Sequence, residues 1–433
     1  MQATGLHHMS SCSKRILKLI FSLLIVVLPS GSFAQSNPEL GLPFITNYSF
    51  KVFDALPQTW AVIEDDRGFM YFGVQGLILE YDGIKWHKIN MLSGNSAAGV
   101  ARSFAKDKKG RIYYGAVGDF GYLGKDSLGQ TISVSLLHLV PQTEREFFDV
   151  WTTYTTDEGI YFQSRDRIFL LNEKNEVKIW KPQTKFMYAF YLDGTYYVHQ
   201  QNLGLMKLQN GSFELIPGSE FLGKERMNVM LPYTPPGSVG TASKQYIIGL
   251  FYSGLFVFDG KNFAPFKTEA DDLIKASTLY KAALLADGNY ALSTTGKGMA
   301  IIDNKGKILN LINRSVGLQD ESVYAIFADS KGALWLALDN GISKVDMTSP
   351  LSQFTSQSGI FTSALTLTRF EGTLYAGTTN GVLRFNESAR RFESVPDIPQ
   401  NQTFNLLKDN GKLYVANDGL FSIKNSKTTL LRP

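Results

Sequence analysis

The sequence has a single cysteine, Cys12, and it lies in an N-terminal segment that we expect to be cleaved. The mature chain would then contain no thiol, which excludes disulfide bonds, thiolate metal sites and cysteine catalysis. The lack of thiols suits an oxidising compartment, because no free thiol is left to mispair. Histidine is also scarce: beyond the N-terminus only His87, His138 and His199 occur, in separate parts of the chain. We therefore expect no metal site and no cofactor.

Charge is low and nearly balanced. Charged residues make up 19% of the chain, which argues against a disordered or coiled-coil protein. Lys14, Arg15 and Lys18 are three of the 43 basic side chains, so 40 remain against 39 acidic ones once the N-terminal segment is removed. No basic stripe is left that would indicate a nucleic-acid partner.

Long apolar runs are absent except at residues 16–28. This run follows three positive charges and precedes the small residues Ser32 and Ala34, which is the order of parts in a secretory signal. The run is shorter than the roughly 20 residues that span a bilayer. We therefore predict a signal peptide over residues 1–34, cleavage after Ala34, and an exported, periplasmic mature chain.

A unit of roughly 40 residues recurs along the rest of the chain. Its clearest copy, residues 322–346, reads as three apolar strands separated by an Asp-x-x-Gly turn at Asp329 and an Asn-Gly turn at Asn340. Asp and Asn followed by Gly supply the backbone angles that tight hairpins need. A repeat of this length built only from short strands predicts an all-β fold, the β-propeller.

The repeats can be counted from their turn signals. Their starts fall near residues 60, 103, 150, 188, 229, 280, 323, 364 and 404. Nine copies exceed the usual four to eight blades of one ring. We therefore predict a leading segment with a ring-closing strand at residues 47–53, a seven-bladed propeller over residues 60–350, and the first two blades of a second, incomplete propeller over residues 351–433. The leading segment spans residues 35–59. Aromatic residues at one recurring position of the second strand, such as Tyr71 and Trp335, are interpreted as packing between blades.

Two motifs resemble a known family. The seventh copy has the pattern Gly317-Leu318, Val323, Ile326, Asp329, Gly332, Leu334-Trp335 and Asn340-Gly341-Ile342, which resembles the two-component regulator propeller repeat. The N-terminal pattern Gly41, Pro43-Phe44-Ile45, Asn47-Tyr48, Gln58, Trp60, Leu79-Glu80-Tyr81-Asp82-Gly83 and Trp86 resembles the N-terminal sensor region of Bacteroidetes receptors. The resemblance covers residues 41–433.

The resemblance implies a sensor in signal transduction. In that family two seven-bladed propellers precede a three-tyrosine immunoglobulin-like domain, a membrane helix, and either a helix-turn-helix domain or a histidine kinase. The resemblance also implies a homodimer formed through the receptor, with membrane attachment only through C-terminal segments that this chain lacks. We therefore expect the chain to be the N-terminal part of a longer receptor.

No catalytic constellation is evident. The sequence has neither a P-loop nor a nucleophile elbow, and most carboxylates fall in turns rather than in strand interiors. We therefore predict a non-catalytic sensor that binds a glycan fragment or another polar small molecule. Two alternatives stay open: a propeller-fold carbohydrate-active enzyme, either a glycoside hydrolase or a lyase, and a scaffold that only binds other proteins.

Candidate ligand-binding residues follow from the general geometry of propellers. Residues just before each first strand are expected at the mouth of the central channel. This places Arg102, Phe148, Trp151, Arg226 and Glu321 around one rim. Flat aromatic rings together with charged groups can grip a polar ligand such as a sugar, by stacking and by charged hydrogen bonds.

Overall fold

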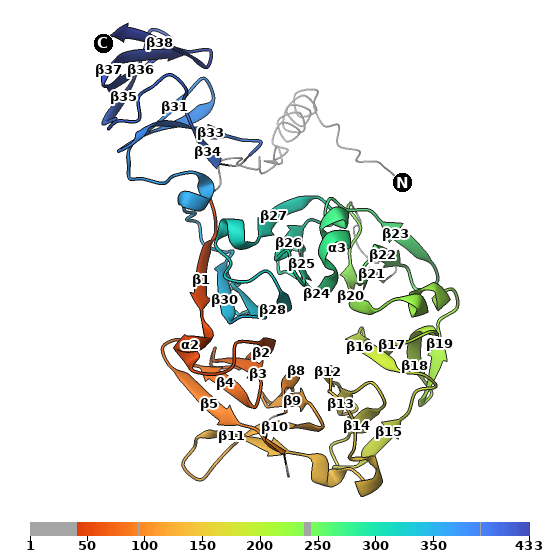
Figure 1. The fold of residues 1–433 in the computed structure, drawn as a ribbon. Coiled ribbons are helices and arrows are strands. Elements are labelled where there is room, and N and C mark those ends of the chain that lie inside the picture. Colours follow the sequence, from red (N-terminus) through yellow and green to blue (C-terminus); the bar gives the residue numbers. More distant parts are fainter. Residues whose placement is uncertain (1–40, 94–95, 98, 238–243, 390) are drawn as a thin grey trace, which may run out of the picture. The chain divides into compact units, whose positions relative to one another are not determined.

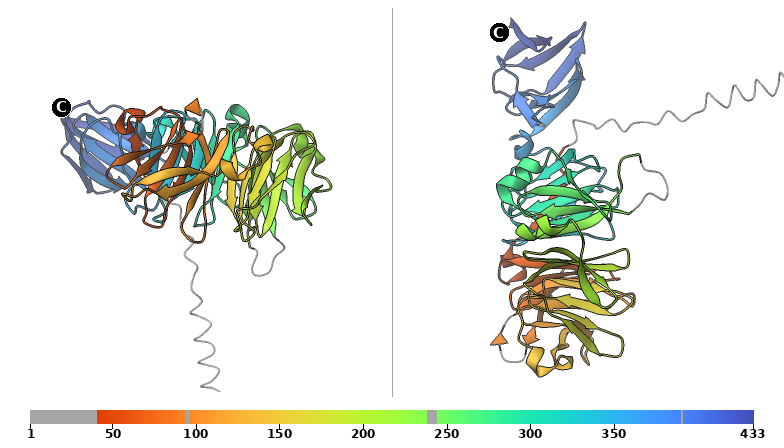
Figure 2. Two further views of the ribbon diagram at one scale, coloured as in Figure 1. Left: turned by 90° about the horizontal axis from the view of Figure 1, so that it is seen from below. Right: turned by 90° about the vertical axis from the view of Figure 1, so that its right-hand side faces the viewer.

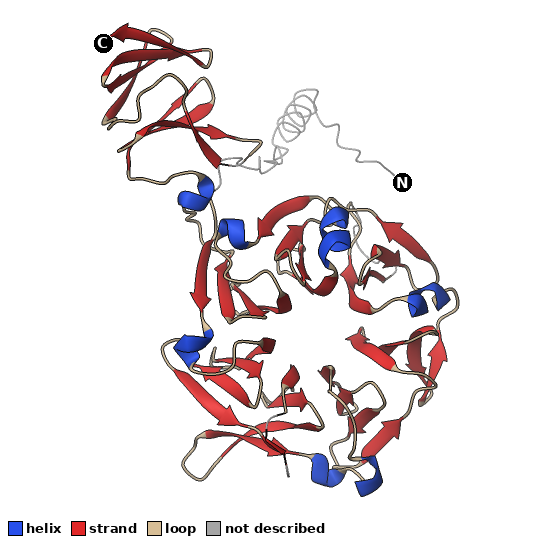
Figure 3. Ribbon diagram, in the orientation of Figure 1, coloured by secondary structure: helices blue, strands red, loops and turns tan. Residues whose placement is uncertain are grey.

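The computed structural model describes residues 41–93, 96–97, 99–237, 244–389 and 391–433. The expected signal peptide and its cleavage site at Ala34 lie outside the described residues. Within them, nine four-stranded sheets form, with antiparallel pairing throughout, and the longest helix is α3 (Asp271–Ser277). The all-β prediction is therefore confirmed, and Figure 3 shows helical turns only in connections between strands.

Seven of these sheets make a closed propeller ring (Figure 1). Each sheet runs outward from an innermost strand, and each innermost strand contacts the next one around the ring, with the seventh contacting the first. The innermost strands are β2 (Thr59–Glu64), β8 (Ala101–Lys106), β12 (Thr152–Thr155), β16 (Phe186–Leu192), β20 (Met227–Tyr233), β24 (Leu279–Leu284) and β28 (Val323–Ala328).

The other strands follow outward in chain order, except that the N-terminal strand is outermost in the seventh sheet. The second strands are β3 (Met70–Val74), β9 (Ile112–Ala116), β13 (Ile160–Gln163), β17 (Thr195–Gln200), β21 (Gln245–Leu250), β25 (Tyr290–Thr294) and β29 (Leu334–Leu338). The third strands are β4 (Leu77–Tyr81), β10 (Asp119–Lys125), β14 (Ile168–Leu171), β18 (Gly204–Gln209), β22 (Gly254–Phe258), β26 (Met299–Ile302) and β30 (Ile342–Asp346). The outermost strands are β5 (Trp86–Asn90), β11 (Thr131–Ser135), β15 (Val177–Trp180), β19 (Ser212–Leu215), β23 (Phe263–Phe266), β27 (Ile308–Ile312) and β1 (Phe44–Tyr48).

The turn that joins a first strand to a second strand shows why the repeat folds as it does. In the seventh sheet the Asp329 carboxylate accepts hydrogen bonds from the backbone N–H groups of Lys331 and Ala333, at 3.0 and 2.8 Å. Gly332 takes a φ of 83°, which a residue with a side chain rarely adopts. The Asp-x-x-Gly signal therefore fixes a tight turn, and the apolar residues on both sides fall into strands.

The strands of the ring run between its two faces (Figure 2). We call the face at which the innermost strands begin the start face. The opposite face carries the turns from first to second strands, such as those at residues 65–68 and 107–110, and we call it the turn face. Because the chain reverses direction at each strand, a residue just before any innermost strand lies on the start face.

The ring is closed by the N-terminal strand. Strand β1 pairs antiparallel with β30, with Phe44 opposite Asp346 and Tyr48 opposite Ile342, so the last sheet contains strands from both ends of the ring. The expected closing strand at residues 47–53 is therefore placed too late. The short helix α2 (Phe50–Phe53) follows instead, because Phe53 turns inward to a buried position. It packs there among aromatic residues of the first and seventh sheets, at the contact that we call the closing seam.

The described residues divide by contacts into two units, Gly41–Ser363 and Ala364–Pro433. The second unit holds two four-stranded sheets that share one apolar core. Its strands are β31 (Ala364–Phe370), β32 (Thr373–Thr378), β33 (Gly381–Asn386), β34 (Arg391–Ser394), β35 (Asn405–Asp409), β36 (Lys412–Asn417), β37 (Gly419–Lys424) and β38 (Lys427–Arg432). Residues 351–363, which the sequence assigns to the second propeller, belong to the first unit by contacts.

Glycines in the second strands allow neighbouring sheets to approach closely on the side of the start face. A Cβ atom on Gly73 of β3 would lie 2.2 Å from the carbonyl oxygen of Ala101 in the next sheet. A Cβ atom on Gly115 of β9 would likewise lie 2.4 Å from a methyl carbon of Val150. The innermost strands are thus set close together where they begin, and this is where the candidate site lies.

Candidate ligand site at the axis of the ring

A β-bulge recurs near the beginning of the innermost strands. One residue is passed over in the pairing of these strands with their second strands: Trp60 in β2, Arg102 in β8, Asn228 in β20, Tyr280 in β24 and Tyr324 in β28. A register shift in β16 spans Met187 and Tyr188. Bulges bend a strand and re-aim the side chain of the extra residue.

The bulge belongs to the repeat itself, because β31 in the second unit has one at Leu365. What differs is the side chain that occupies it. In the ring these positions carry large aromatic, cationic or amide side chains, whereas the second unit has a leucine there. The ring therefore uses a shared backbone feature to bring a particular set of side chains together.

Aromatic side chains from different sheets meet near the axis. Trp60 of the first sheet stacks on Tyr324 of the seventh, with ring centroids 4.4 Å apart and planes at 6°. Trp60 also meets the edge of Trp151, which directly precedes β12, at 6.3 Å. Trp151 lies 6.0 Å from Tyr188 in the fourth sheet, and Tyr280 lies 5.2 Å from Tyr324. The contact between Trp60 and Trp151 skips the second sheet, so these side chains reach toward the centre.

Two arginines lie against these rings. The guanidinium carbon of Arg102 is 3.9 Å from the centroid of Trp60 and 5.0 Å from that of Trp151. Its Nε donates to Asp149 at 2.6 Å, in a pair whose side chains are 15% and 22% exposed. Arg165, in the turn after β13, lies 5.5 Å from the centroid of Trp151. Cations over aromatic faces gain about 0.5–2 kcal/mol, more when they are desolvated.

A second pair of cations lies around Tyr188. The Nζ atom of Lys281 is 4.3 Å from the Tyr188 centroid, and the guanidinium carbon of Arg226 is 5.7 Å from it. Burial lowers the pKa of the Lys281 ammonium, and the positive charge of Arg226 lowers it further, while Tyr188 acts in the opposite sense. Burial also raises the pKa of the nearby Tyr280 hydroxyl far above its ordinary value. This hydroxyl therefore stays protonated.

We call this group of side chains the axial cluster. Its members are Trp60, Arg102, Trp151, Arg165, Tyr188, Arg226, Asn228, Tyr280, Lys281 and Tyr324.

One carboxylate at the edge of the axial cluster accepts hydrogen bonds from two neutral donors. Asp339 accepts from the Gln58 amide at 2.6 Å and from the Tyr324 hydroxyl at 3.0 Å, both at Oδ1. The indole N–H of Trp60 donates to Gln58 at 2.9 Å, which fixes the amide. Burial, and then the hydrogen bond to Asp339, raise the pKa of Tyr324 to about 12. Tyr324 is therefore a permanent donor that helps to position Asp339, and the bond from Gln58 to Asp339 joins the first and seventh sheets.

Several buried polar atoms of the axial cluster have no hydrogen-bond partner among the described residues. They are Nη1 of Arg102, Nε1 of Trp151, the hydroxyl oxygen of Tyr188, Nε of Arg226 and Oδ1 of Asn228. Most buried polar groups in native proteins are paired, and each unpaired one costs about 1–3 kcal/mol. Three of these five atoms are N–H donors and a fourth is a hydroxyl that can donate, so the axial cluster has unused capacity for an acceptor.

The structure separates the five residues predicted from the sequence. Arg102, Trp151 and Arg226 belong to the axial cluster. Phe148 is 67% exposed and contacts no aromatic ring within the described part of the chain. Glu321 uses its side chain to accept the backbone N–H of Arg314 at 3.2 Å, in an exposed turn. Ligand binding by any of the five stays a prediction.

Sequence reasoning missed the other members of the axial cluster as site residues: Trp60, Arg165, Tyr188, Asn228, Tyr280, Lys281 and Tyr324. The signal that could have found most of them is positional. Each bulge residue directly follows the first buried residue of an innermost strand, as in Thr59-Trp60, Leu279-Tyr280 and Val323-Tyr324. Aligning the repeats on that residue would have placed the bulge residues together.

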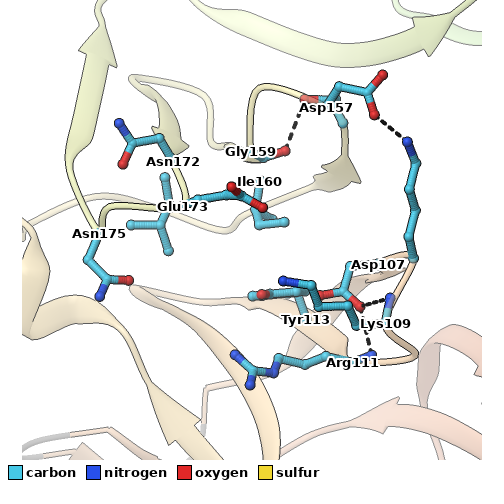
Figure 4. A pocket seen from close by; sticks show the side chains of 13 residues that line it. Asp107, Lys109, Arg111, Tyr113, Asp157, Gly159, Ile160, Asn172, Glu173 and Asn175 are labelled. Atoms are coloured by element: carbon cyan, nitrogen blue, oxygen red, sulfur yellow. Dashed lines mark hydrogen bonds and ion pairs between the residues drawn. The ribbon is translucent and has the colours of Figure 1, made fainter.

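Grooves between sheets open on the turn face. Figure 4 shows one of about 610 Å³ between the second and third sheets, lined among others by Asp107, Arg111 and Glu173. An ion pair between Lys108 and Asp157 spans its rim, and both side chains are highly exposed. A smaller groove of about 360 Å³ between the third and fourth sheets is lined by Tyr161 and Trp180 among others. Neither groove contains an axial-cluster residue, so we do not place the site there.

Within the described ranges, no group of three or more histidine, cysteine, aspartate or glutamate side chains is arranged to hold a metal ion. Over the same ranges, no helix has the length and apolar character needed to cross a bilayer.

Comparison with known proteins shows the fold but no family by sequence. No protein-family model matches the chain, and no curated protein matches it. The extracellular domain assigned to the hybrid two-component system BT3049 of B. thetaiotaomicron is similar in structure, with a TM-score of 0.60 and 16% identity. The match covers 90% of this chain and 54% of that one. The extracellular domain assigned to the system BT4673 of the same organism gives 0.55 and 18%, over 88% and 52%.

These matches confirm, at the level of the fold, the resemblance to receptor sensor regions. The chain spans about half the length of these two domains. Enzymes share the architecture as well: virginiamycin B lyase from Staphylococcus aureus matches with a TM-score of 0.50 and 11% identity, over 70% of this chain and 99% of the lyase. The propeller fold alone therefore does not separate a sensor from an enzyme.

Proposed function

We propose that the chain is the ligand-sensing propeller region of an exported, periplasmic signalling receptor, and that it binds a polar small molecule without transforming it. The site is the axial cluster on the start face of the ring. The observation that carries the proposal is the convergence there of bulged side chains from several sheets, with buried donors that have no partner among the described residues. Bulges are over-represented beside functional sites, where they re-aim side chains.

The composition of the axial cluster favours binding over catalysis. Among the carboxylates near it, Asp149 pairs with Arg102, and Asp339 accepts from Gln58 and Tyr324. Both carboxylates thus hold neighbouring side chains in place, whereas a glycoside hydrolase needs two carboxylates in complementary protonation states that flank the scissile bond. The structural similarity to extracellular domains of two-component systems supports a sensory role.

The test has a binding arm and a turnover arm. The purified chain is screened against oligosaccharide fragments by calorimetry, and each ligand that binds is then incubated with the protein and analysed by mass spectrometry. We expect binding with the ligand recovered intact. Conversion of the ligand to a product would replace the sensor with the enzymatic alternative.

Matched variants locate the site. Trp151→Ala and Arg102→Ala should weaken binding at least tenfold, because they remove axial-cluster side chains. Phe148→Ala lies on the same face but outside the axial cluster, and it should leave binding unchanged. Equal affinity of all three variants and the wild type would remove the axial cluster from consideration. In the source organism, deletion of the gene should abolish the transcriptional response to the same ligand.

A further inference from the structure

We infer that the axial cluster recognises an anionic group, a carboxylate or a sulfate ester, on the ligand. This inference rests on the proposed function and narrows the class of ligand. Three observations support it: the excess of positive charge at the axis, the cations and rings that already cover the aromatic faces, and the hydrogen-bond donors that have no partner among the described residues.

The balance of charge is positive. The axial cluster contains four cations: Arg102, Arg165, Arg226 and Lys281. Among the described residues, only Arg102 of these four has a carboxylate within ion-pair distance, and that partner is Asp149. The other nearby carboxylate, Asp339, is turned to Gln58 and Tyr324. Three cations therefore face the axis without a counter-ion in the described part of the chain.

Packing alone does not account for these cations. Arg226 and Lys281 both lie over Tyr188, where they repel one another, and burial further disfavours the charge on Lys281. Unpaired buried charge destabilises a fold, and an apolar residue of the same length would avoid that cost. Strain of this kind is expected where a site is arranged for a partner of opposite charge.

The aromatic faces are already occupied. One face of Trp60 stacks on Tyr324, and its ring also lies against the guanidinium of Arg102. Trp151 has Arg102 and Arg165 over its ring. These rings hold the guanidinium groups in place, so the axial cluster does not present a bare platform on which a neutral sugar could stack.

Three of the unpaired atoms have the chemistry that matches an anion. Nη1 of Arg102, Nε of Arg226 and Nε1 of Trp151 are all donors. Guanidinium groups form short, charge-assisted hydrogen bonds with carboxylate and sulfate oxygens. A small anion that reaches these donors would satisfy them and would neutralise the repulsion between Arg226 and Lys281.

The experiment uses the full chain and pairs of probes that differ in charge. Calorimetry compares digalacturonic acid with its methyl diester, and a sulfated disaccharide with its unsulfated form; inorganic sulfate serves as the simplest anion. We expect the charged member of at least one pair, or sulfate, to bind at least tenfold more tightly than its neutral control. We also expect that binding to weaken as sodium chloride is raised, because screening acts on charge.

One substitution separates this role from a structural one. Lys281→Met keeps the length of the side chain and its contact with Tyr188 but removes the charge. We expect it to weaken anion binding at least tenfold and to raise the melting temperature, whereas a residue needed for packing would lower that temperature. Lys178→Met is the matched control, because Lys178 lies over Trp180 at 4.7 Å, outside the axial cluster. It should leave anion binding unchanged.

The possible outcomes distinguish this inference from the proposed function. Neutral glycans that bind as tightly as charged ones, and lose affinity in Trp151→Ala, would leave the sensor in place and overturn the anion class. Absence of binding by every anionic probe would overturn the inference as well. The inference would also be overturned if the Lys281→Met variant binds the anion as tightly as wild type, or if it melts at a lower temperature than wild type. If the wild-type chain binds none of the probes, neutral or charged, the proposed site itself is called into question.

Discussion

At the scale of single residues, buried polar side chains join neighbouring sheets through backbone groups. Ser103 donates to the carbonyl of Val150 at 3.0 Å, and Tyr290 to that of Pro232 at 3.0 Å. His199 belongs to this group. It is 1% exposed, its Nε2–H donates to the Leu222 carbonyl at 2.9 Å, and its Nδ1 accepts the N–H of Met227 at 3.4 Å. Both ring nitrogens are used only in the neutral imidazole.

The His199 imidazole should make stability depend on pH. Burial, opposed by the bond to Leu222 and assisted by the charge of Arg226, lowers its pKa from 6.5 to about 4. In the unfolded chain the imidazole is therefore protonated below about pH 6.5, whereas in the folded chain it is protonated only below about pH 4. The stabilisation is present above pH 6.5 and is lost as the pH falls toward 4, by at most about 3 kcal/mol at roughly 1.4 kcal/mol per unit.

The check on His199 is urea unfolding of wild type and His199→Gln between pH 4 and 7.5. The glutamine can still donate to the Leu222 carbonyl but does not titrate. The variant should be less stable at pH 7.5 by about 1–2 kcal/mol and should lose less stability on acidification. His138→Gln alters an exposed histidine and should behave as wild type. Parallel pH profiles for His199→Gln and wild type would contradict the assignment.

Several aromatic residues of the N-terminal motif have a structural role where the ring closes. Tyr48 on β1 stacks on Trp335 with centroids 5.8 Å apart and meets the edge of Trp86 at 5.4 Å. Tyr81 stacks on Trp86 at 4.3 Å. Tyr48, Tyr81 and Trp86 of the N-terminal motif thus cluster with Trp335 of the seventh repeat where the ring closes. This part of the motif reflects ring closure, whereas Trp60 of the same motif belongs to the axial cluster.

Truncation of Tyr48 should therefore weaken the ring. Tyr48→Ala removes the ring that packs between Trp335 and Trp86, and large-to-small changes of this kind cost about 2–4 kcal/mol at a partly buried position. Tyr48→Phe keeps the packing and loses only the 3.5 Å contact with the Tyr81 hydroxyl, so it should cost less than about 1 kcal/mol. Thermal unfolding of both variants checks the difference. Equal losses would show that the hydroxyl, not the stacking, holds the seam.

At the scale of elements, close approach between sheets depends on glycines in second strands. Gly73→Ala would place a Cβ atom 2.2 Å from the Ala101 carbonyl oxygen, one residue before Arg102. The backbone must shift, and we expect a loss of about 1–3 kcal/mol in the free energy of unfolding. Gly296→Ala has no atom within 4 Å of the added carbon and serves as control. Denaturant unfolding should show a clear loss for Gly73→Ala and little change for Gly296→Ala.

The elements themselves were readable from the sequence because their signals are local. The nine expected repeat starts lie within two residues of the first residues of β2, β8, β12, β16, β20, β24, β28, β31 and β35. The Asp-x-x-Gly turn explains this accuracy, since Asp329 and Gly332 act within five consecutive residues. The closing strand was less well placed, because its partner β30 lies at the far end of the ring.

The axial cluster was only partly readable for the opposite reason. The contact between Trp60 and Trp151 joins sheets that are not neighbours, and no local pattern encodes it. The bulges that aim these side chains depend on pairing with the second strands. Phe148 and Trp151 both lie just before β12 in the sequence. Phe148 is nevertheless exposed, whereas Trp151 lies under two arginines. The sequence indicated which types of residue to expect at the site, and only the fold shows which individual residues of those types come together.

At the scale of the whole molecule, the two units differ in whether each of their sheets packs between two others. The ring is continuous, and each sheet packs between two others. In the unit Ala364–Pro433, several large apolar side chains of the two sheets are exposed: Leu367 at 61%, Phe404 at 68%, Leu407 at 60% and Leu430 at 54%. Blades in a repeat protein rely on neighbours to cover both faces, and exposed apolar surface promotes association.

We therefore predict that the chain ending at Pro433 is less soluble and less stable to aggregation than a chain that ends with the ring. The position of the cut matters. The Gly41 N–H donates to the Ser352 hydroxyl at 3.0 Å, and Leu42 exchanges backbone hydrogen bonds with Gln353. A chain ending at Ser363 keeps these bonds, whereas one ending at Pro350 loses them and should melt lower than the chain ending at Ser363. Light scattering during heating compares all three. If the chain ending at Pro433 stays monomeric and melts no lower than the other two, the sheets after Ser363 do not behave as uncovered blades, and the division into a closed ring and an incomplete second propeller fails.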